Sequence, residues 1–185
     1  MSNPIIDTTV ALLERLDDGT RTAAEDSVRA HSREVLGQEV DLEADLNLIK
    51  AAKFVAAADG LSAVELRGMK MMMGSFGLPE AVQWHLLEFD ESTVESTHVG
   101  ELAPDGGREA RFLLSAILHF AALDGLSDDE AARGREVGAA LGQRDNLIEA
   151  LILEARAEHH AARRRDEHQR KLLRDLRLAL LDLDG

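Results

Sequence analysis

AADGLSAVE at residues 57–65 and ALDGLSDDE at residues 122–130 are two copies of one pattern, and this pattern decides the fold. The glycine in each copy can adopt the left-handed backbone conformation that ends a helix. The serine two residues later suits the N-cap of a following helix, and the glutamate three residues after the serine completes a capping box. Each copy therefore predicts two helices joined by a very short corner. We call residues 57–65 the first elbow and residues 122–130 the second elbow.

The similarity extends into the flanks of the elbows. A shift of the sequence by 65 positions gives eleven ungapped identities within residues 48–86, where about three would arise by chance at average residue usage. We infer an internal duplication in which each half, residues 41–90 and residues 107–158, is a three-helix unit. Between the halves, residues 91–107 contain Pro104 and an Asp-Gly-Gly run, so we expect a linker there.

The composition predicts an all-α protein. Of the 185 residues, 45% are hydrophobic but only 3% are aromatic, and the chain is rich in Ala, Leu, Glu and Arg. The net charge of −14 argues against binding to nucleic acid or to an anionic membrane. The absence of cysteine excludes thiol nucleophiles, disulfides and thiolate metal sites. No apolar run approaches the roughly 20 residues of a membrane span, so we expect a cytoplasmic protein without direct membrane insertion.

The two ends of the chain lie outside the duplication. Residues 1–40 predict two amphipathic helices, the first beginning near Pro4. Residues 159–185 are expected to continue the last helix of the second half as one long C-terminal helix. Eight basic and four acidic side chains give residues 156–177 a local charge of +4, and a leucine-rich end follows. This extension could dock on the acidic body or on a partner.

The aspartate before each glycine does not fit a purely structural account of the elbows. Asp59 and Asp124 fall at helix C-termini, where the helix dipole disfavours an anion by about 0.3–1 kcal/mol. Asp-Gly is a favourable turn dipeptide that tolerates this cost, whereas a divalent cation or a basic side chain would offset it. The sequence leaves both explanations open. An EF-hand is excluded, because it would need oxygen ligands where the first half has Val55 and Ala57.

The pattern A-x-D-G-x-[ST]-x-x-E after an alanine-rich helix resembles the TerB family, which is named for bacterial tellurite resistance and is related to the N-terminal domain of a membrane-anchored J-domain co-chaperone. The resemblance covers about Leu42 to Glu158. It implies an all-helical fold with pseudo-twofold halves that binds a divalent metal ion (calcium, magnesium or zinc) through acidic motif residues. Carried over by position, the metal-binding residues are Asp59, Glu65, Asp124 and Glu130. The implied function is a non-enzymatic binding module in a stress-response or envelope-associated assembly, linked at most indirectly to a membrane complex.

A metal-free adaptor or scaffold is the alternative function. Its contacts with a protein partner or a second copy are expected at a Met-rich helix and at the leucine-rich C-terminus. The residues expected there are Met71, Leu176, Leu180 and Leu183. An enzyme is least favoured, because no nucleophile–base or metal-hydrolase spacing occurs. It would require a deep pocket that joins His119 to the acidic pairs, although the repeat equivalent of His119 is Phe54, which favours a packing role.

Overall fold

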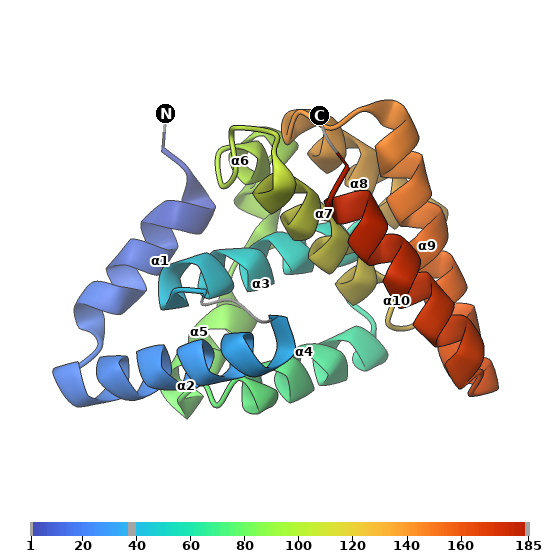
Figure 1. Cartoon of the computed structure of the whole chain (residues 1–185). Helices are drawn as coiled ribbons and strands as arrows, with labels where there is room; N and C mark the ends of the chain where they lie inside the picture. Colours follow the sequence, from blue (N-terminus) through green and yellow to red (C-terminus); the bar gives the residue numbers. More distant parts are fainter. Residues whose placement is uncertain (1, 37–39, 184–185) are drawn as a thin grey trace.

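The computed structural model describes residues 2–36 and 40–183 and confirms the all-α prediction. The described residues form ten α-helices and one short 3-10 helix and contain no strand (Figure 1). In chain order the helices are α1 (Pro4–Arg15), α2 (Asp18–Leu36), α3 (Leu42–Ala56), α4 (Ala63–Ser75), α5 (Glu80–Glu88), η1 (Glu91–Thr93), α6 (Ser96–Gly100), α7 (Arg108–Ala121), α8 (Asp128–Ala140), α9 (Asp145–Arg164) and α10 (Glu167–Leu181). None of them is long and apolar enough to cross a membrane.

Helices α3 and α7 form the centre of the molecule. They pack on each other more extensively than any other pair, with α1 and α2 on one side and α9 and α10 on the other (Figure 1). Almost the whole of α3 is buried, including two lysines. Lys50 Nζ donates to the hydroxyls of Thr8 and Thr9, each at 2.8 Å, and so fastens α1 to α3. Lys53 Nζ donates to Leu87 O at 2.8 Å near the end of α5, where a cation is favourable.

Both elbows have the predicted form. Gly60 and Gly125 have φ values of 98° and 121°, a region that side-chain-bearing residues rarely adopt. Ser62 and Ser127 are the N-caps of α4 and α8, and each belongs to a complete capping box. α4 packs against α7 and α8 packs against α3, so each elbow crosses to the central helix of the other half. The matching caps and crossings agree with a duplication, which itself stays a prediction.

The expected linker is folded. Residues 91–107 contain η1 and α6, and α6 packs on α8. Val94, Val99 and Ala103 are buried. The side chain of Asn3 donates to His98 O at 2.8 Å, which also holds the start of α1 against this segment. The prediction of a plain linker is wrong, because its spaced apolar residues find partners on helices that are distant in sequence.

The predicted long C-terminal helix is two helices. α9 ends at Arg164, and Arg165 adopts the left-handed conformation with φ 57° and ψ 34°. Asp166 then caps the next helix by accepting a hydrogen bond from Gln169 N–H at 2.9 Å. The chain therefore reverses, and α10 packs back along α9 (Figure 1). The prediction of one long helix failed because Asp166 acts as an N-cap and starts a new helix.

Candidate functional site

The elbows place the four predicted metal-binding residues at two depths. Asp59 and Asp124 are exposed, and neither forms a hydrogen bond or an ion pair within the described part of the chain. Glu65 and Glu130 are each only 2% exposed. A buried carboxylate is costly unless something compensates its charge. The unusual chemistry of the elbows therefore lies at the glutamates.

Each buried glutamate uses one oxygen for its capping box. Glu65 Oε2 accepts a hydrogen bond from Ser62 N–H at 2.8 Å, and Glu130 Oε2 accepts one from Ser127 N–H at 2.7 Å. The second oxygen, Oε1, is buried in both residues and has no hydrogen-bond partner among the described residues. Buried polar atoms of this kind are rare in folded proteins. The two Oε1 atoms are therefore the positions at which a proton or a cation would bind.

The two glutamates also interact with each other. Burial raises the pKa of both carboxyl groups. For Glu130, burial and the adjacent Glu65 side chain together raise the pKa to about 7. The charge of Asp124 makes a smaller contribution that raises the pKa of Glu65. Two carboxyl groups this close disfavour double ionisation. In the absence of a cation, the pair therefore holds one proton near neutral pH.

The four predicted ligands are not gathered into one cluster. Within residues 2–36 and 40–183, no group of three or more His, Asp or Glu side chains is placed to hold a metal ion. The glutamate pair alone fits a hard cation in part, because it offers two anionic oxygens with no other partner. Asp124 adds negative charge nearby, whereas Asp59 is not among the leading electrostatic influences on either glutamate. Metal binding by these residues stays a prediction.

A second buried polar cluster joins α7, α9 and α10. The Glu154 side chain is fully buried, with His119 Nε2 at 2.9 Å from its Oε2 and an Arg177 guanidinium nitrogen at 3.7 Å from its Oε1. His119 Nε2 also contacts Arg177. On the other side of the ring, His119 Nδ1 lies 2.8 Å from Ser115 O. A carbonyl oxygen only accepts, so Nδ1 carries a proton.

This cluster differs from the packing role predicted for His119. The ring is partly buried, as expected, but its two nitrogens join a buried ion cluster. One sequence signal could have revealed it: Glu154 follows Leu151 and Ile152 on the buried face of α9, where a charged residue requires a partner. The partner comes from α10, which the sequence does not place.

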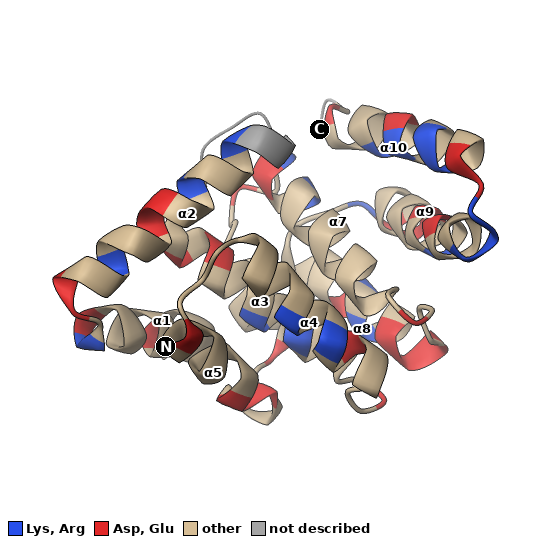
Figure 2. Cartoon of the chain, turned by 90° about the horizontal axis from the view of Figure 1, so that it is seen from below, with Lys and Arg blue, Asp and Glu red and all other residues tan. Residues whose placement is uncertain are grey.

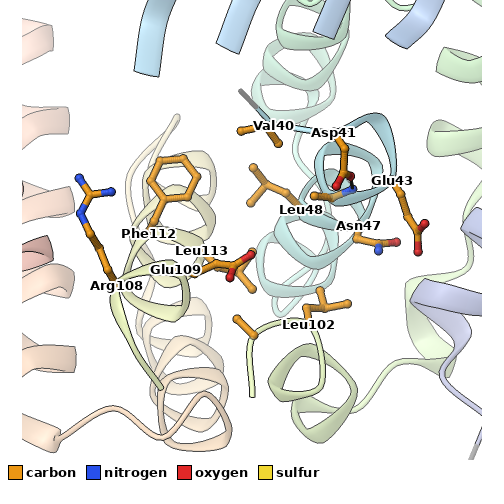
Figure 3. Close-up of a pocket in the computed structure, with 12 residues that line it drawn as sticks. Val40, Asp41, Glu43, Asn47, Leu48, Leu102, Arg108, Glu109, Phe112 and Leu113 are labelled. Atoms are coloured by element: carbon orange, nitrogen blue, oxygen red, sulfur yellow. Dashed lines mark hydrogen bonds between the residues drawn. The ribbon is translucent and has the colours of Figure 1, made fainter. Parts of the chain in front are cut away.

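Two hollows flank the contact between α3 and α7. The first, of about 670 Å³, lies between the beginnings of these two helices. Figure 3 shows Leu48 of α3 opposite Phe112 of α7, with Asp41 and Glu43 on the α3 side and Glu109 on the α7 side. Its charged residues are thus mainly acidic.

The second hollow, of about 640 Å³, is lined by residues of α2, α3, α4, α7 and α10, and we call it the α10 cavity. His119 and Arg177 face it, but none of the four acidic elbow residues lines either hollow. Neither of these two hollows therefore joins His119 to the acidic pairs, as an enzyme would have required.

The residues predicted to contact a partner differ in their exposure to solvent. Met71 is 69% exposed, and Leu176 and Leu183 are 47% and 45% exposed. Leu180 is instead partly buried and packs against the hydrophobic core. α10 thus uses one side to cover the body and presents other leucines to solvent.

Comparison with known proteins adds no further constraint. No family model matches the chain, and neither does any curated protein or solved structure.

Proposed function

We propose that this protein is a non-enzymatic, TerB-like binding module of the cytoplasm, in which the two elbows together take up a divalent cation at Glu65 and Glu130. The proposal includes a role in a stress-response or envelope-associated assembly, which rests on the family resemblance alone. One observation carries the cation: each of these two buried glutamates keeps one carboxylate oxygen without a hydrogen-bond partner in the described residues.

The chemistry of the pair favours a hard cation with oxygen ligands. Calcium or magnesium would neutralise two buried carboxylates and complete its shell with carbonyl oxygens or water, and zinc is a further candidate. The capping boxes support this role, because they fix one oxygen of each glutamate and leave the other available. Since the pKa of Glu130 is raised to about 7, the cation must displace a proton, and its affinity should increase with pH.

Calorimetric titration of metal-stripped protein with calcium, magnesium and zinc tests the proposal. Repeating it in two buffers of different ionisation enthalpy counts the protons released. We expect sub-millimolar binding of at least one ion, release of up to one proton near neutral pH, and loss of binding in Glu65→Gln and Glu130→Gln. Glu14→Gln, an exposed residue of α1, is the matched control. Binding weaker than millimolar, or unchanged in both elbow variants, would remove the metal role.

The variants Asp59→Asn and Asp124→Asn test whether each of the two aspartates contributes to cation binding. Asp124 acts electrostatically on Glu65, so we expect Asp124→Asn to weaken cation binding more than Asp59→Asn does. Equal effects of the two variants would show that the elbows contribute symmetrically.

A metal-free adaptor is the second candidate, favoured by the exposed leucines of α10. Leu172 and Leu176 are 56% and 47% exposed and lie one turn apart on the same side of the helix. Leu183, which follows the helix, is 45% exposed. Light scattering combined with size-exclusion chromatography tests self-association. A dimer that becomes a monomer in Leu176→Asp would support this function. A wild-type monomer would exclude a second copy as the partner.

A further inference from the structure

We propose that the α10 cavity is a binding site for an anionic amphiphile, a small molecule with one carboxylate head and an elongated apolar body. The site is separate from the elbows, because none of the four acidic elbow residues lines the cavity. The inference is therefore independent of cation binding.

The walls of the cavity are mainly apolar and come from different parts of the chain. α2 contributes Val28, α4 contributes Met72, Phe76 follows directly after α4, and α7 contributes Phe112. α10 closes the cavity with Leu178 and Leu181. The volume of about 640 Å³ lies within the range of 300–1,000 Å³ that is typical of small-molecule sites. A hollow of this size with apolar walls on several helices suits the apolar body of a ligand.

Three arginines line the cavity. Arg108 of α7 is paired with Asp182, at 2.8 Å, and the other two lie on α10. These are Arg174 and Arg177, one helical turn apart. The charge of Arg177 is partly balanced by Glu154, at 3.7 Å. Arg174 is exposed and forms no hydrogen bond or ion pair within the described residues. The cavity therefore offers one guanidinium without a counter-charge on the protein, and a guanidinium binds a carboxylate in a planar, two-point geometry.

The opposite wall supplies a polar group that tolerates an anion. Asp45 of α3 lines the cavity, is only 7% exposed, and has an Oδ2 atom without a hydrogen-bond partner among the described residues. Burial raises the pKa of Asp45 to about 7. In its protonated form the side chain adds no negative charge and can donate a hydrogen bond to a ligand oxygen.

The distribution of charge over the molecule sets the sign of the ligand head. The whole chain carries −14, and the neighbouring hollow is lined by Asp41, Glu43 and Glu109 (Figure 3). Figure 2 shows basic residues on α10 and on the connection from α9 to α10. An anion is repelled by most of this surface, so the arginines of the α10 cavity are a local exception that selects a negative head group.

Calorimetric titration of the full chain tests the site with three probes that share a twelve-carbon tail. The probes are dodecanoate, dodecan-1-ol and dodecyltrimethylammonium, each below the concentration at which it aggregates. We expect dodecanoate to bind at least about fivefold more tightly than the alcohol, the factor that corresponds to an ion pair of about 1 kcal/mol. The cationic probe should bind most weakly. Absence of dodecanoate binding, equal affinity for the alcohol, or tighter binding of the cation would each overturn the proposal.

Two variants separate the contribution of the head from that of the tail. Arg174→Gln should weaken dodecanoate binding about fivefold and leave the alcohol unaffected, whereas Arg163→Gln, an exposed arginine of α9 outside the cavity, should change neither. Ala116→Trp places a large side chain in the cavity and should abolish binding of both probes. Ala116→Leu replaces it if the tryptophan variant shows an altered circular dichroism spectrum.

One further result would reassign the cavity. If Ala116→Trp converts a dimer to a monomer and dodecanoate does not bind the wild type, the cavity is filled by a second copy of the chain. That result would also overturn the proposal.

Discussion

Replacing Glu130 by glutamine removes the titrating group of the elbow pair and keeps the size of the side chain. The amide oxygen of glutamine can still accept the hydrogen bond from Ser127 N–H, so the cap of α8 is retained. The amide nitrogen can donate to the free oxygen of Glu65, as a proton shared by the two carboxyl groups would. Glu130→Gln therefore imitates the protonated pair at every pH.

The size of the effect follows from the two pKa values of Glu130. The ordinary value is 4.5 and the folded value is about 7, a difference that makes the ionised folded form about 3 kcal/mol less favourable. Between these two pH values the folded protein binds more protons than the unfolded chain. Stability contributed by Glu130 is therefore fully present below pH 4.5 and is lost as pH rises through 7.

Urea unfolding at several pH values, with a chelator present, measures this contribution. At about pH 4 the variant and the wild type should be equally stable. At about pH 8, Glu130→Gln should be more stable by up to about 3 kcal/mol, while the control Glu14→Gln follows the wild type. Titrating groups that do not interact with the elbow pair contribute equally in the variant and the wild type and cancel. If Glu130→Gln is less stable than the wild type at pH 8, the ionised carboxylate has a favourable partner, and the argument for a shared proton is wrong.

Four further substitutions test packing, burial and backbone strain, each by urea or thermal unfolding. Burial lowers the pKa of Lys50 from 10.5 to about 7. Between these two pH values the folded protein binds fewer protons than the unfolded chain, so its stability rises with pH. Lys50→Met should abolish this rise. A Cβ atom at Gly100 would lie 2.5 Å from Ala140 O, so Gly100→Ala should cost about 1–3 kcal/mol. Gly74→Ala, where a Cβ meets nothing within 4 Å, should instead stabilise by about 0.5–1 kcal/mol. Arg165→Gly should stabilise by up to about 1 kcal/mol, because φ at this residue is 57°.

The parts of the fold that could be predicted depend on neighbouring residues. Each elbow is specified within nine residues, since the glycine, the serine and the glutamate satisfy one another's backbone groups. The all-α class follows in the same way from composition and helical periodicity. The break after α9 also has a local signal, because Asp166 is a good N-cap residue, but the prediction of one long helix did not use it.

The remaining features depend on contacts between distant residues. The fold of residues 91–107 requires Asn3 from the other end of the sequence. The cluster of His119, Glu154 and Arg177 combines three helices, and only the charge of Glu154 on an apolar face indicated it. The α10 cavity exists because α10 turns back along α9. A prediction of one long C-terminal helix therefore could not place Arg174 and Arg177 near α2 and α4.

Capping and cation binding by the elbow glutamates would compete if both used the same oxygen, since an oxygen bound to a cap amide is less available to a ligand. The structure assigns the roles to different atoms: Oε2 of Glu65 and of Glu130 accepts the cap hydrogen bond, and both Oε1 atoms remain without one in the described residues. The cap thus fixes the rotamer that keeps the second oxygen buried beside its counterpart. This arrangement, with one oxygen in the cap and one oxygen free, predicts a particular response to Ser62→Ala. Loss of the serine hydroxyl should weaken the cap by about 1 kcal/mol and also weaken cation binding, although Ser62 contributes no ligand. A variant that loses stability but binds the cation as the wild type does would show that the cap and the ligand oxygen are independent.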